Sequence, residues 1–263
     1  MLTVALDRMV GDLALPDGVR VVAGANPPDQ AAGGYDLSAP LANRFCHITY
    51  SPTVQDWLTG TAARWKSTPA TRAVMASNER RSHTLSAVMG FINHRPDLLD
   101  KMPDSPEERG GAWPSRRTWT MLADVLAHLR ADDLAATQTV AFGLVGEGAG
   151  LEFLTWLEHA DLPDPAAVTA DPSIVDWAHE RQDRVWAVLN GVVTLAAERA
   201  TVEAFRNAWK PLGAAADAGV ADMAAAAART LATFRPPSTR IPSEMRKFAP
   251  MLQAAGLIGE DAA

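Results

Sequence analysis

Apolar residues recur three or four positions apart along most of the 263-residue chain, with polar residues between them. That spacing places the apolar side chains on one face of an amphipathic helix. A short helix is predicted over residues 1–10, and a longer one starts at Pro114-Ser115. Further predicted helices cover residues 53–66, 71–92, 133–145, 151–159, 173–199, 201–232 and 242–255. The chain is therefore expected to be mainly α.

Two stretches near the N-terminus carry the pattern of strands instead. Residues 19–25 begin with a nearly continuous apolar run, and Phe45 to Tyr50 form a second candidate. Continuous apolar runs are typical of parallel strands that are covered on both faces. Leu13 and Leu15 precede Pro16-Asp17-Gly18 and indicate a short extended piece before a turn. We therefore expect a residual α/β piece of two or three strands near the N-terminus.

Stretches rich in proline and glycine divide the helical pattern. Residues 100–113 are polar and predict a loop, and Gly146 to Gly150 predict a connection between two helices. The segment 161–172, DLPDPAAVTADP, is the best candidate for a subdomain boundary. The predicted regions are residues 1–50, 51–160 and 161–263.

The bulk composition narrows the classes of function. Apolar residues make up 48% of the chain, which is enough for a core, so extensive disorder is not expected. The formal net charge of −7 argues against a protein that binds nucleic acid through bulk electrostatics. Cys46 is the single cysteine, and the six histidines lack metal-ligand spacing, so neither a disulfide nor a metal site is expected. The chain has no secretory leader and no apolar run of ~18 residues, which predicts a soluble cytoplasmic protein without a membrane partner.

Asn26 is the first of three polar positions that suggest chemistry. It follows the predicted strand 19–25 and precedes Pro27-Pro28. In parallel α/β sheets ligands bind beyond the carboxyl ends of the strands, where an amide can orient a water molecule towards a phosphate. The alternative interpretation is an ordinary Asn-Pro turn that closes a strand.

Arg44 is the second, within the segment Pro40-Leu41-Ala42-Asn43-Arg44-Phe45. Leu41 and Phe45 are expected to pack inward, which leaves Arg44 free just before the second predicted strand. The alternative is a solvated arginine near the C-terminus of a helix, where a cation is favourable.

Arg116 and Arg117 form the third, in the first turn of the helix that starts near Ser115. A positive charge there opposes the helix dipole and costs roughly a few tenths of a kcal/mol. A bound anion would turn that cost into a gain. The alternative is a pair of arginines solvated at the surface.

These positions lie in segments that resemble the MoxR-like AAA+ ATPases. The resemblance rests on Asn26-Pro27, Gly34-Tyr35-Asp36-Leu37, Leu41 to Phe45 and Ala112 to Trp119. It implies that Asn26 is sensor 1, that Arg44 is a finger on the nucleotide of a neighbouring subunit, and that Arg117 is sensor 2. Arg116 stands where relatives often have proline, so it remains an alternative to Arg117 for sensor 2.

The same resemblance covers only the C-terminal part of such an ATPase. The sequence contains no G-x-x-x-x-G-K-[ST] phosphate loop, and no apolar strand with a paired acidic motif for magnesium precedes residue 19. Residues 1–50 would be the end of the α/β core, 51–160 the helical lid and 161–263 a helical C-terminal extension. We expect intact relatives to hydrolyse ATP with Mg²⁺, and this chain alone not to bind either tightly.

The resemblance also implies partners. Family members act as chaperone-like remodelers, assemble as rings and often work beside proteins with von Willebrand A domains. The strand that lies between 19–25 and 45–50 in the family is absent, and an open slot in a sheet predicts a partner or poor solubility. A separate N-terminal ATPase half would be such a partner. A late start codon, a split gene or a boundary introduced by cloning would each explain the missing half.

Two other functions stay open at this point. The chain could be a non-catalytic helical adaptor or regulatory subunit of an AAA+ assembly that contributes Arg44 in trans. It could also be a plain helical scaffold in which Asn26, Arg44 and Arg117 are incidental.

Overall fold

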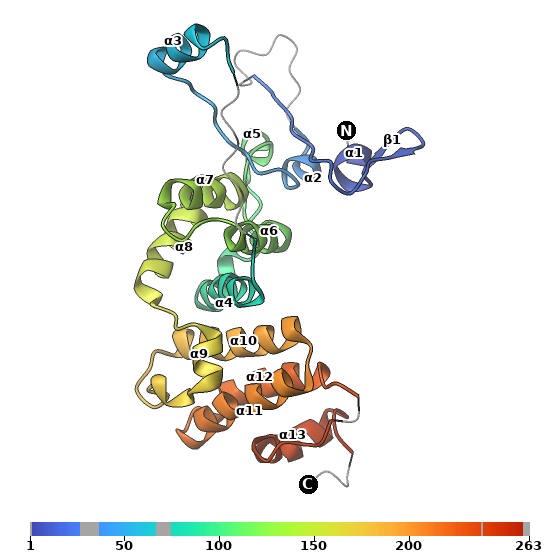
Figure 1. Ribbon diagram of the computed structural model, residues 1–263, viewed down its shortest axis with the longest axis vertical. Coiled ribbons are helices and arrows are strands. Elements are labelled where there is room, and N and C mark those ends of the chain that lie inside the picture. Colours follow the sequence, from blue (N-terminus) through green and yellow to red (C-terminus); the bar gives the residue numbers. More distant parts are fainter. Residues whose placement is uncertain (1, 27–36, 67–74, 238, 260–263) are drawn as a thin grey trace.

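The computed structural model describes residues 2–26, 37–66, 75–237 and 239–259, and these are mainly helical. A thin N-terminal part lies at one end of the molecule, and two stacked groups of helices form the rest (Figure 1). None of the described helices combines the length and the apolar composition needed to cross a bilayer. The prediction of a mainly α protein is therefore confirmed.

The N-terminal helix is shorter than predicted. Helix α1 covers Leu2–Leu6 and is followed by a hairpin of β1 (Met9–Val10) and β2 (Leu13–Ala14). The strands are antiparallel, with Met9 opposite Ala14 and Val10 opposite Leu13. Arg8 and Gly11 have positive φ angles of 55° and 58°, which stop the helix and turn the chain between the strands.

The two longer strands predicted over residues 19–25 and 45–50 do not form. The described sheet contains only β1 and β2. Val22 is 91% exposed and Tyr50 is 80% exposed, so these apolar runs are not covered on both faces. A strand obtains its backbone hydrogen bonds from neighbouring strands, and the described residues provide none beside these segments. The prediction that residues 19–25 and 45–50 are strands of an α/β piece is therefore wrong.

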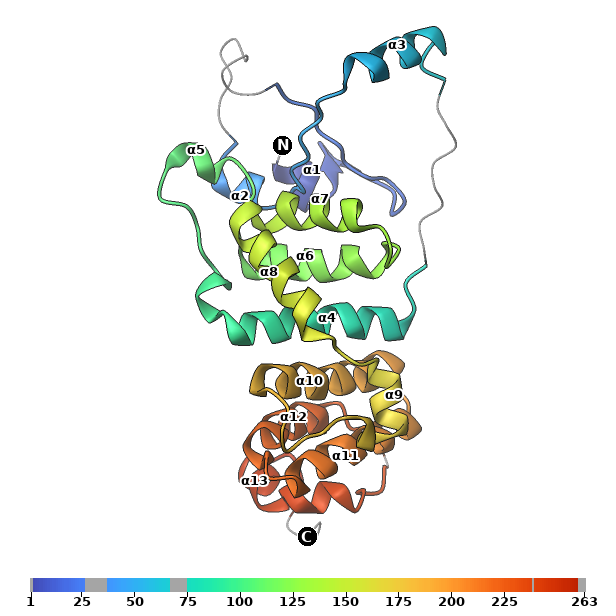
Figure 2. The same ribbon diagram turned by 90° about the vertical axis from the view of Figure 1, so that its left-hand side faces the viewer.

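Helix α2 (Ala39–Ala42) attaches this N-terminal part to the helical body. Leu41, Ala42 and Asn43 are buried, and the backbone N–H of His47 donates to the carbonyl of Gly143 at 2.7 Å. A side chain at Gly143 would lie 2.8 Å from Cys46 Sγ, so the glycine permits this close approach. Helix α3 (Val54–Ala62) has a complete capping box and stands clear of the body (Figure 2).

The first helical group contains the predicted lid helices. Its elements are α4 (Asn78–His94), η2 (Pro96–Leu98), α5 (Pro106–Arg109), α6 (Arg116–Ala127), α7 (Leu134–Val145) and α8 (Glu147–Ala160). Phe91 lies at the centre of their core, with ring centroids of Trp119 and Phe153 at 5.4 Å and of Trp156 at 5.9 Å. These aromatic side chains anchor the core of the first group.

Three boundaries in this group differ from the prediction. Helix α4 begins at Asn78, where the Ser77 hydroxyl caps it, and α5 interrupts the loop predicted over 100–113. Helix α8 begins at Glu147, so only Gly146, with a φ of 80°, separates it from α7. The predicted connection therefore shrinks to one residue, and Gly150 lies inside α8 where its missing side chain makes room for Phe142.

The second helical group forms its own core. Its elements are α9 (Pro165–Ala170), η3 (Pro172–Ile174), α10 (Gln182–Arg199), α11 (Val202–Asp217), α12 (Ala221–Thr233), η4 (Glu244–Phe248) and α13 (Ala249–Ala254). Trp209 is fully buried, with the rings of Phe205 at 5.9 Å and Phe248 at 6.0 Å. The single helix predicted over 201–232 is divided into α11 and α12, and Gly219 has a φ of 94° at the break.

Helices α4 and α10 join the two groups. Helix α4 lies directly above α10 in both views (Figures 1 and 2). A side chain at Gly90 would lie 2.5 Å from the Cβ of Ala187, and one at Gly191 would lie 3.0 Å from the Ser86 hydroxyl. Small residues therefore allow the two helices to approach closely, and α10 contributes to both cores.

Candidate functional site at the junction of α2 and α6

A buried polar network ties the Arg44 segment to the start of α6. Asn43 is 3% exposed, and its Nδ2 donates to the carbonyl of Trp113 at 3.2 Å. The hydroxyl of Ser115 donates to Asn43 Oδ1 at 2.6 Å. Buried polar groups that are satisfied in this way fix the relative position of two segments. The residues just after Asn43 and just after Ser115 are therefore held together.

The first turn of α6 is fixed by its own cap. The Ser115 hydroxyl accepts from the backbone N–H of Thr118 at 3.2 Å, and the Thr118 hydroxyl accepts from the N–H of Ser115 at 2.8 Å. This reciprocal pair is a capping box, which satisfies two of the free N–H groups at a helix N-terminus. It confirms the prediction that a helix starts at Pro114-Ser115.

Arg116 and Arg117 are the first two residues of α6 and differ in their surroundings. Arg116 forms an ion pair with Asp100 at 2.5 Å between Nη1 and Oδ2. Arg117 is exposed, and within the part of the chain that the structure describes it has no hydrogen-bond or ion-pair partner. An unpaired cation at the positive end of a helix dipole lowers the energy of a nearby anion. Of the two candidates for sensor 2, Arg117 is thus the one whose charge is not already neutralised.

Arg44 is not free, in contrast to the prediction from its segment. Leu41 packs inward as expected, but Arg44 is half-buried, and its Nη1 donates to the carbonyl of Pro40 in the preceding helix α2. Its Nε is buried without an acceptor among the described residues, and so is the indole Nε1 of Trp113. Both groups are donors only, so an incoming acceptor such as a carboxylate or phosphate oxygen would satisfy them.

Asn26 is not brought into this network. It is exposed, and residues 19–25, which lead up to it, do not form a strand. It has no hydrogen-bond partner within the described residues. Pro27 and the motif residues Gly34 to Asp36 lie outside the described part of the chain. The structure thus joins the segments of Arg44 and Arg117 and leaves Asn26 apart from them.

Asn43 is the functional candidate that sequence reasoning missed. It lies within the quoted motif, yet the motif drew attention only to the neighbouring arginine. An amide among apolar residues on a short helix is a signal for a buried hydrogen bond, because such a group costs free energy unless it is paired. Trp113 was missed for a different reason, since its contribution is a backbone carbonyl that any residue could supply.

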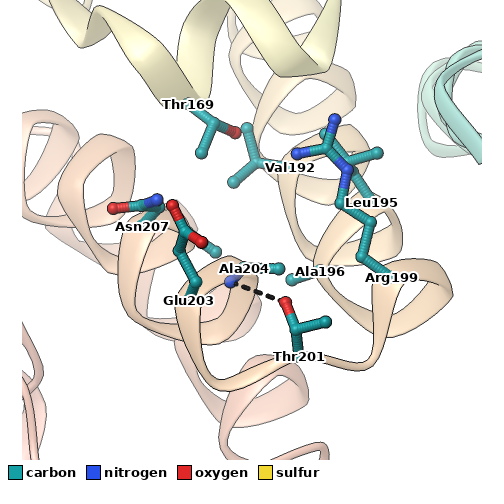
Figure 3. Close-up of a pocket in the computed structure, with 10 residues that line it drawn as sticks. Thr169, Val192, Leu195, Ala196, Arg199, Thr201, Glu203, Ala204 and Asn207 are labelled. Atoms are coloured by element: carbon teal, nitrogen blue, oxygen red, sulfur yellow. Dashed lines mark hydrogen bonds between the residues drawn. The ribbon is translucent and has the colours of Figure 1, made fainter.

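A hollow lies in the second helical group, between α9, α10 and α11. It has a volume of about 250 Å³, and Arg199, Glu203 and Asn207 point into it (Figure 3). Thr201 caps α11 at its edge by accepting from the backbone N–H of Ala204 at 3.1 Å. The Arg199 guanidinium already pairs with Glu79 on α4 at 2.6 Å, and this pairing helps to bring the pKa of Glu79 to about 2. The hollow therefore carries both charges and favours neither a simple anion nor a simple cation.

Among the described residues, neither the single thiol nor a cluster of metal-ligating side chains forms a second site. Burial raises the pKa of the Cys46 thiol, which keeps it protonated and a weak nucleophile. Among the described residues no three histidine, cysteine, aspartate or glutamate side chains gather in a way that could hold a metal ion.

No protein-family model, no curated protein and no solved structure matches this chain. The family resemblance therefore rests on the sequence motifs alone.

Proposed function

We propose that this chain is the C-terminal part of a MoxR-like AAA+ ATPase that carries the sensor and lid elements. In the complete assembly Arg117 would bind the phosphates of ATP, Arg44 would act on the nucleotide of a neighbouring subunit, and Asn26 would orient the attacking water. The phosphate loop and the Mg²⁺ ligands would come from a separate N-terminal half or from sequence upstream. The intact protein would act as a chaperone-like remodeler in the cytoplasm.

One observation carries this proposal. The hydrogen bonds of Asn43 hold the Arg44 segment against the N-terminus of α6, where Arg117 is unpaired. Two arginines on a shared rigid support are suited to phosphoryl transfer, in which catalysis consists mainly of positioning and charge stabilisation. Arginine fingers contribute roughly 10³–10⁵ in rate in other phosphoryl-transfer systems.

A titration of ATP with Mg²⁺, followed by calorimetry, tests the proposal. We expect no tight binding by this chain and tight binding by a version extended upstream through a phosphate loop. In the extended version Arg117→Ala should weaken binding, whereas Arg229→Ala, an exposed arginine on α12, should not. Tight binding by the chain alone, or no binding by either version, would overturn the proposal.

A second candidate is a non-catalytic helical adaptor or regulatory subunit of an AAA+ assembly. The missing sheet favours it, since residues 19–25 and 45–50 form no strands of an ATPase core. The two candidates differ in one measurement. Sequence upstream of this chain should encode an in-frame phosphate loop if the chain is part of an ATPase, and should encode none if the chain is an adaptor. Under either candidate Arg44→Ala should lower kcat by about 10³-fold or more in an assembly where Arg44 is a finger.

A ring of identical subunits, or a complex with a protein that contains a von Willebrand A domain, would be the context for either role. The exposed apolar residues of the N-terminal part, such as Val22 and Ile48, support the need for a partner.

A further inference from the structure

Helix α3 presents an apolar face that nothing in the described chain covers. None of its residues is buried, and Val54, Trp57 and Leu58 are all exposed, with Trp57 at 56%. Arg64 and Trp65 then have positive φ angles of 52° and 51°. The chain turns back there and lays the Trp65 ring over Gly60, where a side chain would lie 2.3 Å from it.

A free helix of this length is not stable on its own account. Helix α3 has nine residues, and isolated helices shorter than about 12–15 residues are marginal in water. Its capping box of Thr53 and Asp56 satisfies the first turn but buries no apolar surface. Contact of the apolar face with a second surface would stabilise the helix.

The first helical group contains a groove with the matching character. It lies between the start of α4, the end of α6, the start of α7 and the end of α8, and its volume is about 880 Å³. Its apolar lining consists of Leu126, Leu129, Leu134, Leu154, Leu157 and Leu162. Leu134, at the first position of α7, is 75% exposed. Amphipathic helices bind in grooves of this kind by inserting large apolar side chains.

The charges at the rim of the groove are divided between its sides. Glu158, Asp161 and Asp164 lie on the side of α8 and α9, where only Asp161 approaches a cation, Arg184, at 4.0 Å. Glu158 and Asp164 have no ion-pair partner among the described residues.

The other sides of the rim carry cations. Arg130 lies between α6 and α7, paired with Asp132, and Arg80 lies on α4 beside His83. The guanidinium of Arg80 donates to the carbonyls of Ala127 and Leu129, so its charge is not neutralised by an acid. Glu79, the remaining charged group, is neutralised by Arg199.

Helix α3 carries the complementary distribution. Asp56 lies in its first turn, and Arg64 and Lys66 follow its C-terminus. With its apolar face in the groove, one orientation brings Arg64 and Lys66 to the acidic side and Asp56 to the side of Arg80 and Arg130. Such complementarity fixes the orientation of a partner more than its affinity.

We propose that α3 of one copy docks into the leucine-lined groove of a second copy. Each copy would then donate one helix and accept another, so the contact is heterologous and repeats into a closed ring or an open chain. The projection of α3 away from the body leaves it accessible to a neighbour (Figure 2). The contact involves no nucleotide and does not rest on the proposed ATPase function.

Complementation between two variants tests this assembly, with the molar mass measured by light scattering in the absence of ATP. The helix variant is Trp57→Asp with Leu58→Asp, and the groove variant is Leu134→Arg with Glu158→Arg. All four positions are exposed, so both variants should fold with the circular dichroism and melting temperature of the wild type. The matched control is Leu151→Arg with Glu147→Arg, which changes exposed residues of α8 outside the groove.

We expect masses above that of the monomer for the wild type and the control, and a monomer for each variant alone. An equimolar mixture of the two variants should form a one-to-one dimer, because it restores a single intact helix and a single intact groove. A monomeric wild type, a variant that still assembles, or a mixture that stays monomeric would each overturn the proposal. The wild type would also be monomeric if α3 bound the groove of its own chain or a different protein, and this proposal would then be wrong.

Discussion

The N-terminal part of the molecule, residues 2–66, and the helical body that starts at α4 have similar shares of apolar residues but bury them very differently. Among the described residues of the N-terminal part, only Leu41, Ala42 and Asn43 are buried. The body, by contrast, has two cores built around large aromatic side chains such as Phe91 and Trp209. Apolar composition alone therefore does not determine whether a segment forms a core.

The difference lies in where each part finds its backbone hydrogen bonds. A helix satisfies its own N–H and C=O groups, so the helices of the body form from local sequence and then pack. A strand depends on its neighbours, and residues 19–25 and 45–50 have none within the described chain. The predictions below separate the two parts by experiment.

The largest effect is expected from a core tryptophan compared with an exposed one. Trp209→Ala should lower the free energy of unfolding by about 3–5 kcal/mol, because it leaves a cavity between Phe205 and Phe248. Trp57→Ala on α3 should change it by less than about 0.5 kcal/mol. Urea unfolding of dilute protein measures both. Equal losses would show that α3 is as well packed as the body.

A smaller effect is expected where the two helical groups meet. Gly90→Ala places a methyl group 2.5 Å from Ala187 and should destabilise the protein by about 1–3 kcal/mol, less the roughly 1 kcal/mol gained in helix propensity. Gly148→Ala is the matched control, because nothing lies within 4 Å of its new methyl group. Thermal unfolding of the two variants should differ in this direction. If Gly90→Ala is the more stable one, the close approach of α4 and α10 is not required.

The attachment of the N-terminal part is tested at Asn43. Asn43→Ala removes the acceptor of the Ser115 hydroxyl and one of the two donors to the Trp113 carbonyl, which keeps the Thr118 hydroxyl at 3.2 Å, at a cost of about 1–3 kcal/mol. Hydrogen exchange should become about tenfold faster or more in residues 39–47, with little change in α10. Asn207→Ala, in the hollow of the second helical group, serves as the control and should leave residues 39–47 unchanged. Unaltered exchange in Asn43→Ala would mean that Leu41 and Ala42 suffice for the attachment.

The smallest effect concerns pH. Burial of the Asp183 carboxyl would raise its pKa, but hydrogen bonds from Arg181 at 2.5 Å and from the Trp156 indole at 3.0 Å outweigh burial and bring it to about 2. An unfolded aspartate has a pKa near 3.9, so the native state binds fewer protons than the unfolded state. The resulting stability is present above about pH 4 and is lost as the pH falls towards about 2.

Asp183→Asn should therefore remove up to about 2 kcal/mol at pH 7 and flatten the loss of stability between about pH 4 and pH 2. Urea unfolding as a function of pH measures this. Arg130 pairs with Asp132 at the surface, so Asp132→Asn is the control and should have little effect at either pH. A steep acid transition that persists in Asp183→Asn would assign it to other carboxyl groups.

The sequence predicted the body better than the N-terminal part for the same physical reason. Helical periodicity identified α6 and α7 closely, and the capping residue Ser115 marked a true boundary. It failed where tertiary contacts override local preference, as at Gly150, which lies inside α8 against Phe142. The strands failed because a covered strand requires neighbours that no local pattern can supply.

The candidate site was predictable in part. Charge and position on a helix singled out Arg116 and Arg117, but only the structure distinguishes the paired side chain from the unpaired one. The link between Asn43 and Ser115 spans 72 positions of the chain, and such a distant hydrogen bond leaves no periodic trace in the sequence. For Asn26 and the residues that follow it, the role at the site stays a prediction.

Because Cys46 packs against Gly143, the reactivity of its thiol reports on the attachment of the N-terminal part. As the single cysteine, Cys46 is the one thiol that a reagent in solution could modify. It is half-buried and protonated while the N–H of His47 is bonded to the carbonyl of Gly143, so it should react mainly when this contact opens. The rate of thiol labelling therefore measures how often the N-terminal part separates from α7. A ligand that stabilises the junction of α2 and α6 would be detected because it slows the labelling of Cys46.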